Sequence, residues 1–425
     1  MNWSRLHKGM SEIHAYRTDD VPALSSGSRS ATVTLGARAI SVEITDTAHL
    51  SAVRADWTSL LARADAPNVF MDPVLVRVAA GLDPAVRYCA LRAWRTIGGE
   101  RQLVGLWCFA VARPRQSALP MRLLNAPPCL YSYLATPVID RSCIDETLDA
   151  MLDCIAADRR LPKIVALDAM AAEGRTYEAL VRVLARRSSA PCILQQSRRP
   201  KLQSALDGKA YLEKALSSST RKKLRQHRRR LSEKGAVTSV IASEPEAVRR
   251  AFQDFLALEA SGWKGREGTA LLSDKADAAF MREAVGALAE LGCASIHSLC
   301  LDGKAVSIQL VARAGAAAFT WKTAYDEALQ DFSPGTLLLE DYTAAFLADK
   351  SIAFVDSCSF DDRGYMSSWS ERQPVVDLWI DARLGGSLTF RVLSGAQRSY
   401  RWLRAGAKSA YLAFRNFDWP TARKR

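Results

Sequence analysis

A strand-like run ends at Tyr325, and the corner Ser333-Pro334-Gly335 then starts an apolar-periodic helix over residues 336–348. A further apolar run over 351–358 has the length and composition of a second strand. The order strand, turn, helix, strand is typical of an α/β sheet. In such a sheet, ligands bind beyond the carboxyl ends of the strands, where neighbouring strands diverge. The corner therefore marks a candidate ligand site.

A helix that starts at this corner directs unpaired backbone N–H groups and the positive end of its dipole at the crevice. That arrangement suits phosphate oxygens. Ser333 can cap the helix, Pro334 fits its first turn, and Gly335 allows close approach of a ligand to the backbone. The alternative is that Ser-Pro-Gly is only a favourable way to start a helix.

The two halves of the chain repeat one order of elements. In the first half, helical patterns precede a hairpin signal around Gly98-Gly99, and a helix and a strand follow. In the second half, helical patterns over 245–260 and 275–291 precede a hairpin that turns at Asp302-Gly303, a type I′ sequence. We therefore expect two similar domains with mixed α/β sheets.

The chain divides into five expected segments on composition and pattern. These are a disordered lead at 1–35, a first domain at 36–204, a basic helical connector at 205–240, a second domain at 241–385 and a basic amphipathic tail at 386–425. The lead mixes Ser, Gly, Arg and Asp without a period, as disordered segments do.

Composition excludes several classes of protein. No run approaches the roughly 18 apolar residues of a membrane span, and the first residues lack the apolar core of a signal peptide, so we expect a cytoplasmic protein. The nine cysteines contain no C-x-x-C pair. They are typical of buried small hydrophobes in a reducing compartment, and neither disulfides nor a metal site is expected.

Lys and Arg together exceed Asp and Glu by 13, which favours an anionic partner. Much of the excess lies in residues 221–234, expected to be a helix in which Arg225 and Arg229 either form a rim for an anionic substrate or are simply solvated. Few aromatic residues interrupt this run, so nucleic-acid binding is not favoured. The tail from Arg391 combines basic and apolar residues; it either rests on an anionic membrane near a polysaccharide synthase or packs on the first domain.

The corner and its flanking strands resemble the core of the GNAT acyltransferase superfamily. The phosphate loop of that family follows the pattern Gln/Arg-x-x-Gly-x-Gly/Ala, and residues 330–335 of this chain are Gln-Asp-Phe-Ser-Pro-Gly. The resemblance implies that acetyl-CoA or another acyl-CoA is the co-substrate, with its pantetheine between two strands and its pyrophosphate at the helix start. The residues implied as contacts are Gln330, Ser333, Gly335, Thr336 and Leu337.

Three phrases carry a narrower resemblance: E-x-S-G-W-K-G-x-x-G-T-A-L at 259–271, W-K-x-A-Y-D-E at 321–327 and F-S-P-G-x-L-L at 332–338. They are similar to the CelD-type acetyltransferases, which are FemAB-like proteins with tandem GNAT domains. This resemblance implies an N- or O-acyltransferase, most simply an acetyltransferase, that acts on a glycan, amine or hydroxyl acceptor in cellulose, exopolysaccharide or envelope synthesis.

Acyl transfer needs a base that takes a proton from the accepting amine or hydroxyl. Asp326 follows the strand that should line the acyl group and is our first candidate; the alternative is a solvated loop carboxylate. Tyr325 either donates its phenol proton to the departing thiolate or is structural. Strand alternation puts Trp321 and Lys322 on opposite faces. Lys322 is expected to contact a ligand or to form an ion pair with Glu259.

Glu259, Trp263 and Lys264 lie between a helix and several glycines, which suits a loop over an acceptor pocket. Trp263 either stacks on a sugar or plugs the interface between the domains. Asp356, at the end of an apolar strand, is expected to point into the crevice and contact substrate.

Two other functions remain open at this stage. FemAB relatives transfer amino acids from aminoacyl-tRNA, and the basic helix would then hold RNA. A non-catalytic partner of a glycan synthase would keep the fold as a binding module. Serine or cysteine hydrolase chemistry is excluded because the chain has no G-x-S-x-G elbow, and its five histidines lie in unsuitable contexts.

Overall fold

The computed structural model describes residues 31–33, 40–83, 85–114, 116–117, 119–359 and 365–415. The lead predicted to be disordered lies outside these residues, apart from the short strand β1 (Ala31–Val33). Among the described helices, none combines the length and the apolar character that a membrane crossing requires.

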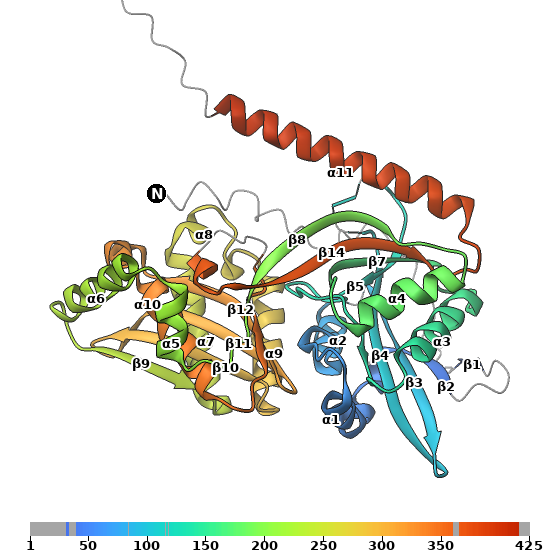
Figure 1. Cartoon of the computed structure of the whole chain (residues 1–425), viewed down its shortest axis with the longest axis horizontal. Coiled ribbons are helices and arrows are strands. Elements are labelled where there is room, and N and C mark those ends of the chain that lie inside the picture. Colours follow the sequence, from blue (N-terminus) through green and yellow to red (C-terminus); the bar gives the residue numbers. More distant parts are fainter. Residues whose placement is uncertain are drawn as a thin grey trace, which may run out of the picture.

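The first half contains alternating helices and strands (Figure 1). In chain order they are β2 (Ile40–Thr45), α1 (Arg54–Arg63), α2 (Pro73–Leu82), β3 (Arg87–Ile97), β4 (Glu100–Ala112), β5 (Leu123–Ala126), β6 (Val138–Ile139), α3 (Ile144–Ala157), β7 (Ile164–Ala171), α4 (Arg175–Arg186) and β8 (Cys192–Leu202).

The second half follows the same plan after two connecting helices. Its elements are α5 (Gly208–Ala215), α6 (Ser218–Ser232), β9 (Val237–Ala242), α7 (Pro245–Ser261), α8 (Trp263–Arg266), α9 (Lys275–Glu290), β10 (Ala294–Leu301), β11 (Lys304–Ala314), β12 (Ala317–Tyr325), the 3-10 helix η7 (Glu327–Phe332), α10 (Pro334–Ala348), β13 (Phe354–Asp356), β14 (Glu371–Asp381) and α11 (Leu388–Arg415).

Turn chemistry explains the hairpins and one helix start. Gly98 and Gly99 both have positive φ between β3 and β4, and Asp302 and Gly303 do the same between β10 and β11, as a type I′ turn requires. Both predicted hairpins are confirmed. The side chain of Asp72 caps α2 by accepting a hydrogen bond from the N–H of Val74 at 2.9 Å, and Pro73 occupies the first position of the helix.

Within the described residues, the strands form one 14-stranded mixed sheet. Its order is β1-β2-β3-β4-β5-β7-β14-β8-β13-β12-β11-β10-β9, with β6 paired to β4. Each half contributes one parallel pair, β5 with β7 and β12 with β13, among otherwise antiparallel neighbours. The predicted mixed α/β class is confirmed.

Strands β8 and β14 tie the halves together. β14 lies within the segment predicted for the second domain, yet it pairs with β7 on one side and with β8 on the other. β8 in turn pairs through Lys201 and Leu202 with β13. Figure 1 shows these two long strands curving side by side from one half to the other. Each half therefore depends on a strand from elsewhere in the chain to complete its sheet.

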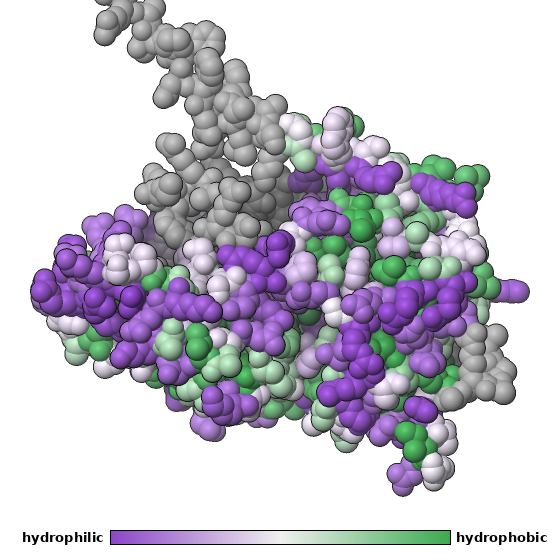
Figure 2. Space-filling view, in the orientation of Figure 1, coloured by the Kyte–Doolittle hydropathy of each residue, from purple (hydrophilic) through white to green (hydrophobic). Residues whose placement is uncertain are grey.

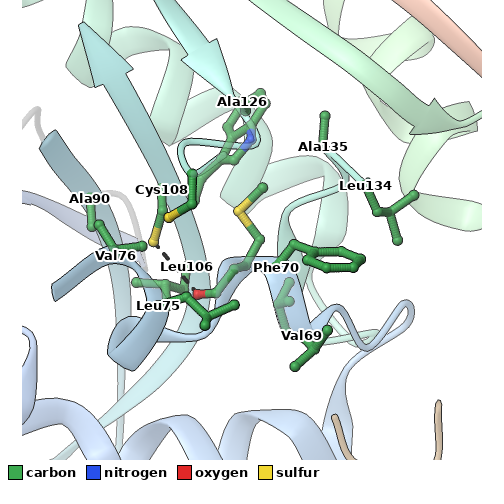
Figure 3. Packing of buried hydrophobic residues seen from close by; sticks show 14 of the residues in the cluster. Val69, Phe70, Leu75, Val76, Ala90, Leu106, Cys108, Ala126, Leu134 and Ala135 are labelled. Atoms are coloured by element: carbon green, nitrogen blue, oxygen red, sulfur yellow. Dashed lines mark hydrogen bonds between the residues drawn. The ribbon is translucent and has the colours of Figure 1, made fainter. Parts of the chain in front are cut away.

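The core continues across the junction of the halves. Phe70 lies beside Val69, Leu134 and Ala135 (Figure 3), and its ring meets that of Phe319 of β12 at a centroid distance of 5.4 Å. The buried thiol of Cys108 faces the carbonyl oxygen of Met71 at 3.6 Å, which is drawn as a dashed line in Figure 3. Shared apolar burial of this kind favours a fixed arrangement of the two halves.

A buried ion pair also joins the halves. Asp356 at the end of β13 is completely buried, and its carboxylate is bound by the guanidinium of Arg199 from β8 and by the N–H of Cys358. Arg199 donates a second hydrogen bond to the carbonyl oxygen of Tyr133 at 2.8 Å. The prediction that Asp356 points into a crevice and contacts substrate is therefore wrong: β8 covers this end of β13, and the carboxylate balances a buried cation.

We expect Asp356→Asn to lower the free energy of unfolding by about 3–5 kcal/mol, because Arg199 would keep its charge in the core without a counterion. Urea unfolding at pH 7 measures this loss. The matched control is Asp349→Asn, whose ion pair with Arg313 is partly exposed, and which should cost about 1 kcal/mol or less. Equal losses in the two variants would contradict the claim that breaking the buried Asp356–Arg199 pair costs more stability than breaking an exposed pair.

Candidate active site

Strands β12 and β13 run together for only three residues. Ala317, Ala318 and Phe319 pair with Phe354, Val355 and Asp356, and β12 then continues to Tyr325 without β13 beside it. In the same region, Leu310 of β11 pairs with Lys322 while Val311 pairs with Thr320, which makes Trp321 an extra residue on β12. Such a bulge bends a strand and increases its twist. The strands diverge here, as an α/β ligand site requires.

The bulge corrects one sequence prediction. Strict alternation placed Trp321 and Lys322 on opposite faces, but the register shift at Trp321 interrupts that alternation. Trp321 is buried, and its indole N–H donates to the carbonyl oxygen of Tyr131 in the first half at 2.6 Å.

The corner after β12 differs in detail from the prediction. Ser333 has φ 50° and ψ 54°, the left-handed conformation that favours glycine, and its side chain makes no capping hydrogen bond. The predicted cap is therefore wrong. The carbonyl oxygen of Ser333 instead accepts hydrogen bonds from Thr336 at 2.9 Å and Leu337 at 3.1 Å. Pro334 occupies the first turn as predicted.

Because of these hydrogen bonds, few backbone N–H groups at the start of α10 are left to bind a ligand. The amides of Thr336 and Leu337 are already satisfied, Leu337 is fully buried, and Pro334 has no N–H. In the described part of the chain, the N–H of Gly335 has no backbone acceptor. The space that a Cβ on Gly335 would fill is open, and the nearest atom is Cδ1 of Tyr325 at 4.0 Å. The start of α10 is therefore accessible at Gly335.

Basic side chains of α6 and of the turn that follows it lie against this corner. The guanidinium of Arg230 and the ammonium of Lys234 lie 5.3 and 5.4 Å from the ring centroid of Phe332, the last residue of η7. Arg225 and Arg229, the two predicted substrate contacts, are exposed on the opposite side of α6, because a helix turns 100° per residue. The structure therefore brings Arg230 and Lys234, not the predicted pair, to the corner. Hydrophilic residues gather at this end of the molecule in Figure 2.

Helix α6 is anchored next to α10 by another arginine that the sequence analysis did not single out. Arg228 donates to the carboxylate of Asp341 at 2.6 Å and approaches Glu340 at 3.4 Å. Leu224 and Leu231 are buried on one face of α6. The position of the basic helix beside the corner is thus fixed by both charge and packing.

A buried carboxylate organises the other side of β12. Glu259 of α7 accepts hydrogen bonds from the ammonium of Lys264 at 2.8 Å and the N–H of Leu271 at 2.9 Å. Lys322 lies 3.7 Å away, which confirms the predicted ion pair. Burial acts to raise the pKa of Glu259, but Lys322, Lys264 and the Leu271 amide hold it below its ordinary value. Glu259 thereby holds the loop from α8 to Leu271 against β12.

Lys322 connects this cluster to the first half. Its ammonium lies 4.4 Å from the ring centroid of Tyr131, whose hydroxyl donates to Asp277 of α9 at 2.7 Å. Burial lowers the pKa of Lys322 to about 8, although Glu259 opposes the shift. Burial also raises the pKa values of Tyr131 and Asp277. No local pattern marks Tyr131, which reaches the cluster from a loop of the other half.

The end of β12 holds the remaining candidates. The Asp326 carboxylate caps η7 by accepting from the N–H of Ala328 at 2.9 Å. The next residue, Glu327, accepts from the N–H of Trp263 and from Arg266, each at 2.5 Å, and ties α8 to the strand. Burial and Glu327 raise the pKa of Tyr325, so its phenol stays protonated at neutral pH. Trp263 is half-buried in this loop.

Comparison with known proteins agrees with this geometry. Residues 218–362 match the sequence model of the family described as acetyltransferase (GNAT) domain. This segment of the chain is therefore similar to GNAT acetyltransferase domains. The match includes β12, the corner, α10 and β13, and also the basic helix α6. Comparison with curated protein sequences gave no significant match.

The chain is similar to solved structures over most of its length. The crystal structure of FemX is 12% identical with a TM-score of 0.53, and the match covers 78% of this chain and 96% of FemX. A tandem GNAT protein from the clavulanic acid biosynthesis pathway is 12% identical with a TM-score of 0.42, over 81% of this chain and 98% of that one. The likeness to FemX, at this identity, is one of fold.

We expect Glu259→Gln to lower the free energy of unfolding by about 3 kcal/mol at pH 7, because Lys264 and Lys322 would lose their buried counterion. The loss should shrink as the pH falls below 4.5, the ordinary pKa of glutamate. The folded-state pKa of Glu259 lies lower, so its stabilisation is present above pH 4.5 and is lost as the pH falls through that lower value.

Urea unfolding across this pH range tests the prediction. Glu233→Gln removes an exposed partner of Arg229 and should change stability by less than about 0.5 kcal/mol. Adding Lys322→Met to Glu259→Gln should restore part of the loss, since one unpaired cation is then removed. If Glu259→Gln lost the same stability at every pH, the ion pairs of Glu259 with Lys264 and Lys322 would not be the source of that loss.

Proposed function

We propose that the protein is an acyl-CoA-dependent N- or O-acyltransferase, most simply an acetyltransferase, that serves exopolysaccharide, cellulose or envelope assembly. The accessible start of α10 beside the diverging strands β12 and β13 carries this proposal. The GNAT domain supports acyl transfer. The assignment to polysaccharide or envelope assembly rests on the resemblance of residues 259–271, 321–327 and 332–338 to CelD-type proteins.

The residues at the corner fit a nucleotide diphosphate. Gly335 offers a backbone N–H and open space, and Arg230 and Lys234 supply positive charge next to it. Gln330 is exposed on the same turn and is a further candidate contact. Within the described residues, no strand pairs with β12 after Phe319 on the β13 side, and this edge offers backbone groups to the amide-rich arm of the donor. A bound thioester supplies the activated acyl group.

We assign the chemical steps to the residues at the end of β12. One carboxylate oxygen of Asp326 caps η7, and the other is available to take the proton of the accepting amine or hydroxyl. Tyr325, beside Gly335, holds its phenol proton at neutral pH and can give it to the departing thiolate. Asp326 and Tyr325 thus act as base and acid on neighbouring positions.

Glu259 and Lys322 act as positioning residues. They are bound to each other, and Glu259 also holds Lys264 and the Leu271 amide. The loop that they fix carries Trp263, which is placed to contact the acceptor or to close the junction of the halves. We propose that the acceptor binds between this loop and β12.

A second function has one observation in its favour. Arg225 and Arg229 form an exposed basic face on α6 that the proposed donor site does not use. A FemAB-like transfer from aminoacyl-tRNA would place RNA on that face. Binding of tRNA with a steep dependence on salt, and lost in Arg225→Ala/Arg229→Ala, would favour this function over acyl-CoA. A binding module without activity would bind neither donor.

We expect acetyl-CoA to bind the wild-type protein in a saturable manner and Gly335→Trp to lose at least about tenfold in affinity, because an indole would fill the space at the helix start. Isothermal titration calorimetry measures both. Gly81→Trp is the matched control, since Gly81 is also on a helix with open space around it, and should bind normally. Unchanged affinity in Gly335→Trp would remove the corner from the donor site.

We expect Asp326→Asn to lower kcat at least about 100-fold with little change in KM for acetyl-CoA, because asparagine can still cap η7 but cannot accept the proton. Release of free thiol from acetyl-CoA, measured with a panel of amino sugars as acceptors, follows the reaction. Asp331→Asn, an exposed carboxylate on the same turn, should react at the wild-type rate. A normal kcat in Asp326→Asn would rule out its role as base.

A further inference from the structure

Helix α11 packs on the first half through one face. Phe390 and Ser394 are buried against β14 and β8, and the buried side chain of Gln397 hydrogen-bonds to Gln116 and Ser117. The guanidinium of Arg401 donates to Asp377 at 2.6 Å and lies 3.7 Å from Asp168. The predicted alternative that the tail packs on the first domain is thus confirmed for this inner face. Figure 1 shows α11 running across the ends of the two long strands and extending past them.

The opposite face of α11 is apolar and exposed. Leu388, Val392, Trp402 and Leu403 expose 74, 61, 74 and 61% of their surface. At 100° per residue, positions 388, 392 and 403 lie within about 60° of one another on the helix, and 402 lies next to them. Leu384, just before the helix, is 72% exposed and extends the apolar surface. We call these five residues the α11 stripe.

Charge on α11 has a single sign. Residues 388–415 contain no Asp or Glu and six basic residues: Arg391, Arg398, Arg401, Arg404, Lys408 and Arg415. Arg391 and Arg398 are exposed and border the stripe on one side, whereas Arg401 is used by the inner face. In Figure 2, hydrophobic and hydrophilic side chains lie next to each other along the upper edge, where Figure 1 places α11.

We propose that the α11 stripe docks on an anionic phospholipid membrane, with its apolar side chains at the boundary of headgroups and acyl chains. Apolar residues with a tryptophan, bordered by arginines, match the surface-lying amphipathic helices that bind such membranes. Arginines beside the stripe would contact lipid phosphates, and Trp402 would lie at the headgroup level. This docking does not depend on which acyl donor the protein uses.

Two other occupants fit the charges less well. A second copy of the chain would bring the same arginine-bordered face against itself in a symmetric dimer, without an acidic residue on α11 to offset the repulsion. RNA binding relies on several stacking aromatics, whereas the stripe has one tryptophan among aliphatic side chains.

Co-sedimentation of the full chain with vesicles tests the proposal. We expect binding to an equimolar mixture of phosphatidylglycerol and phosphatidylcholine, weaker binding to phosphatidylcholine alone, and a decrease with added salt. Val392→Asp/Leu403→Asp should reduce partition into the anionic vesicles roughly tenfold or more. The matched control is Leu82→Asp/Leu272→Asp, two leucines that are 44 and 43% exposed on α2 and before α9, and it should bind like the wild type.

Fluorescence adds a local readout. Subtracting the emission spectrum of Trp402→Phe from that of the wild type gives the emission of Trp402. Its maximum should shift to shorter wavelength when anionic vesicles are added, because the indole leaves water. Unchanged far-UV circular dichroism and Tm in the stripe variant would show that it folds. Equal vesicle binding by wild type and stripe variant would overturn the proposal. Two further results would overturn it. One is a dimer of the wild type that forms without vesicles and is lost in Val392→Asp/Leu403→Asp but not in the control; the other is tRNA binding that is lost in the same way.

Discussion

The pairing of β8 with β14 is the interaction on which the remaining structure depends. β14 completes the sheet of the first half beside β7, and β8 holds the far edge of β13 in the second. With β13 held there and Asp356 bound to Arg199, β12 keeps only three paired residues with β13. The divergence of strands at the proposed donor site therefore depends on β8 and β14, which lie outside the matched residues 218–362.

Charge acts at two levels in the second half. In the interior, Asp356 and Glu259 each balance basic groups, and each thereby fixes a strand or a loop. Breaking such a pair costs more than forming it contributes, so these carboxylates mainly enforce geometry. At the surface, Arg230 and Lys234 remain available to an anionic ligand beside Gly335. Positions that looked equivalent in sequence thus divide into structural and ligand-facing roles.

Part of the candidate site was predictable from short segments of the chain. The Glu259–Lys322 pair and the start of α10 followed from motifs and strand order. Ser333 was predicted to cap α10 with its side chain, but it adopts the left-handed conformation and makes no such hydrogen bond. The sequence Ser-Pro-Gly is compatible with both conformations. Arg225 and Arg229 were predicted to contact substrate, but the burial of Leu224 and Leu231 turns them away from the corner and brings Arg230 there instead. Tyr131 gave no signal at all, since its role arises only when the two halves meet.

By itself, the sequence determined the local elements: turn residues with positive φ set both hairpins, and apolar periodicity set the helices and most strands. It also determined the excess of positive charge on α6 and α11. Only the tertiary structure decided that β14 returns to the first half, that Asp356 is buried, and which face of each basic helix is exposed. Those features depend on pairing between residues far apart in the chain, and no local preference encodes such a pairing.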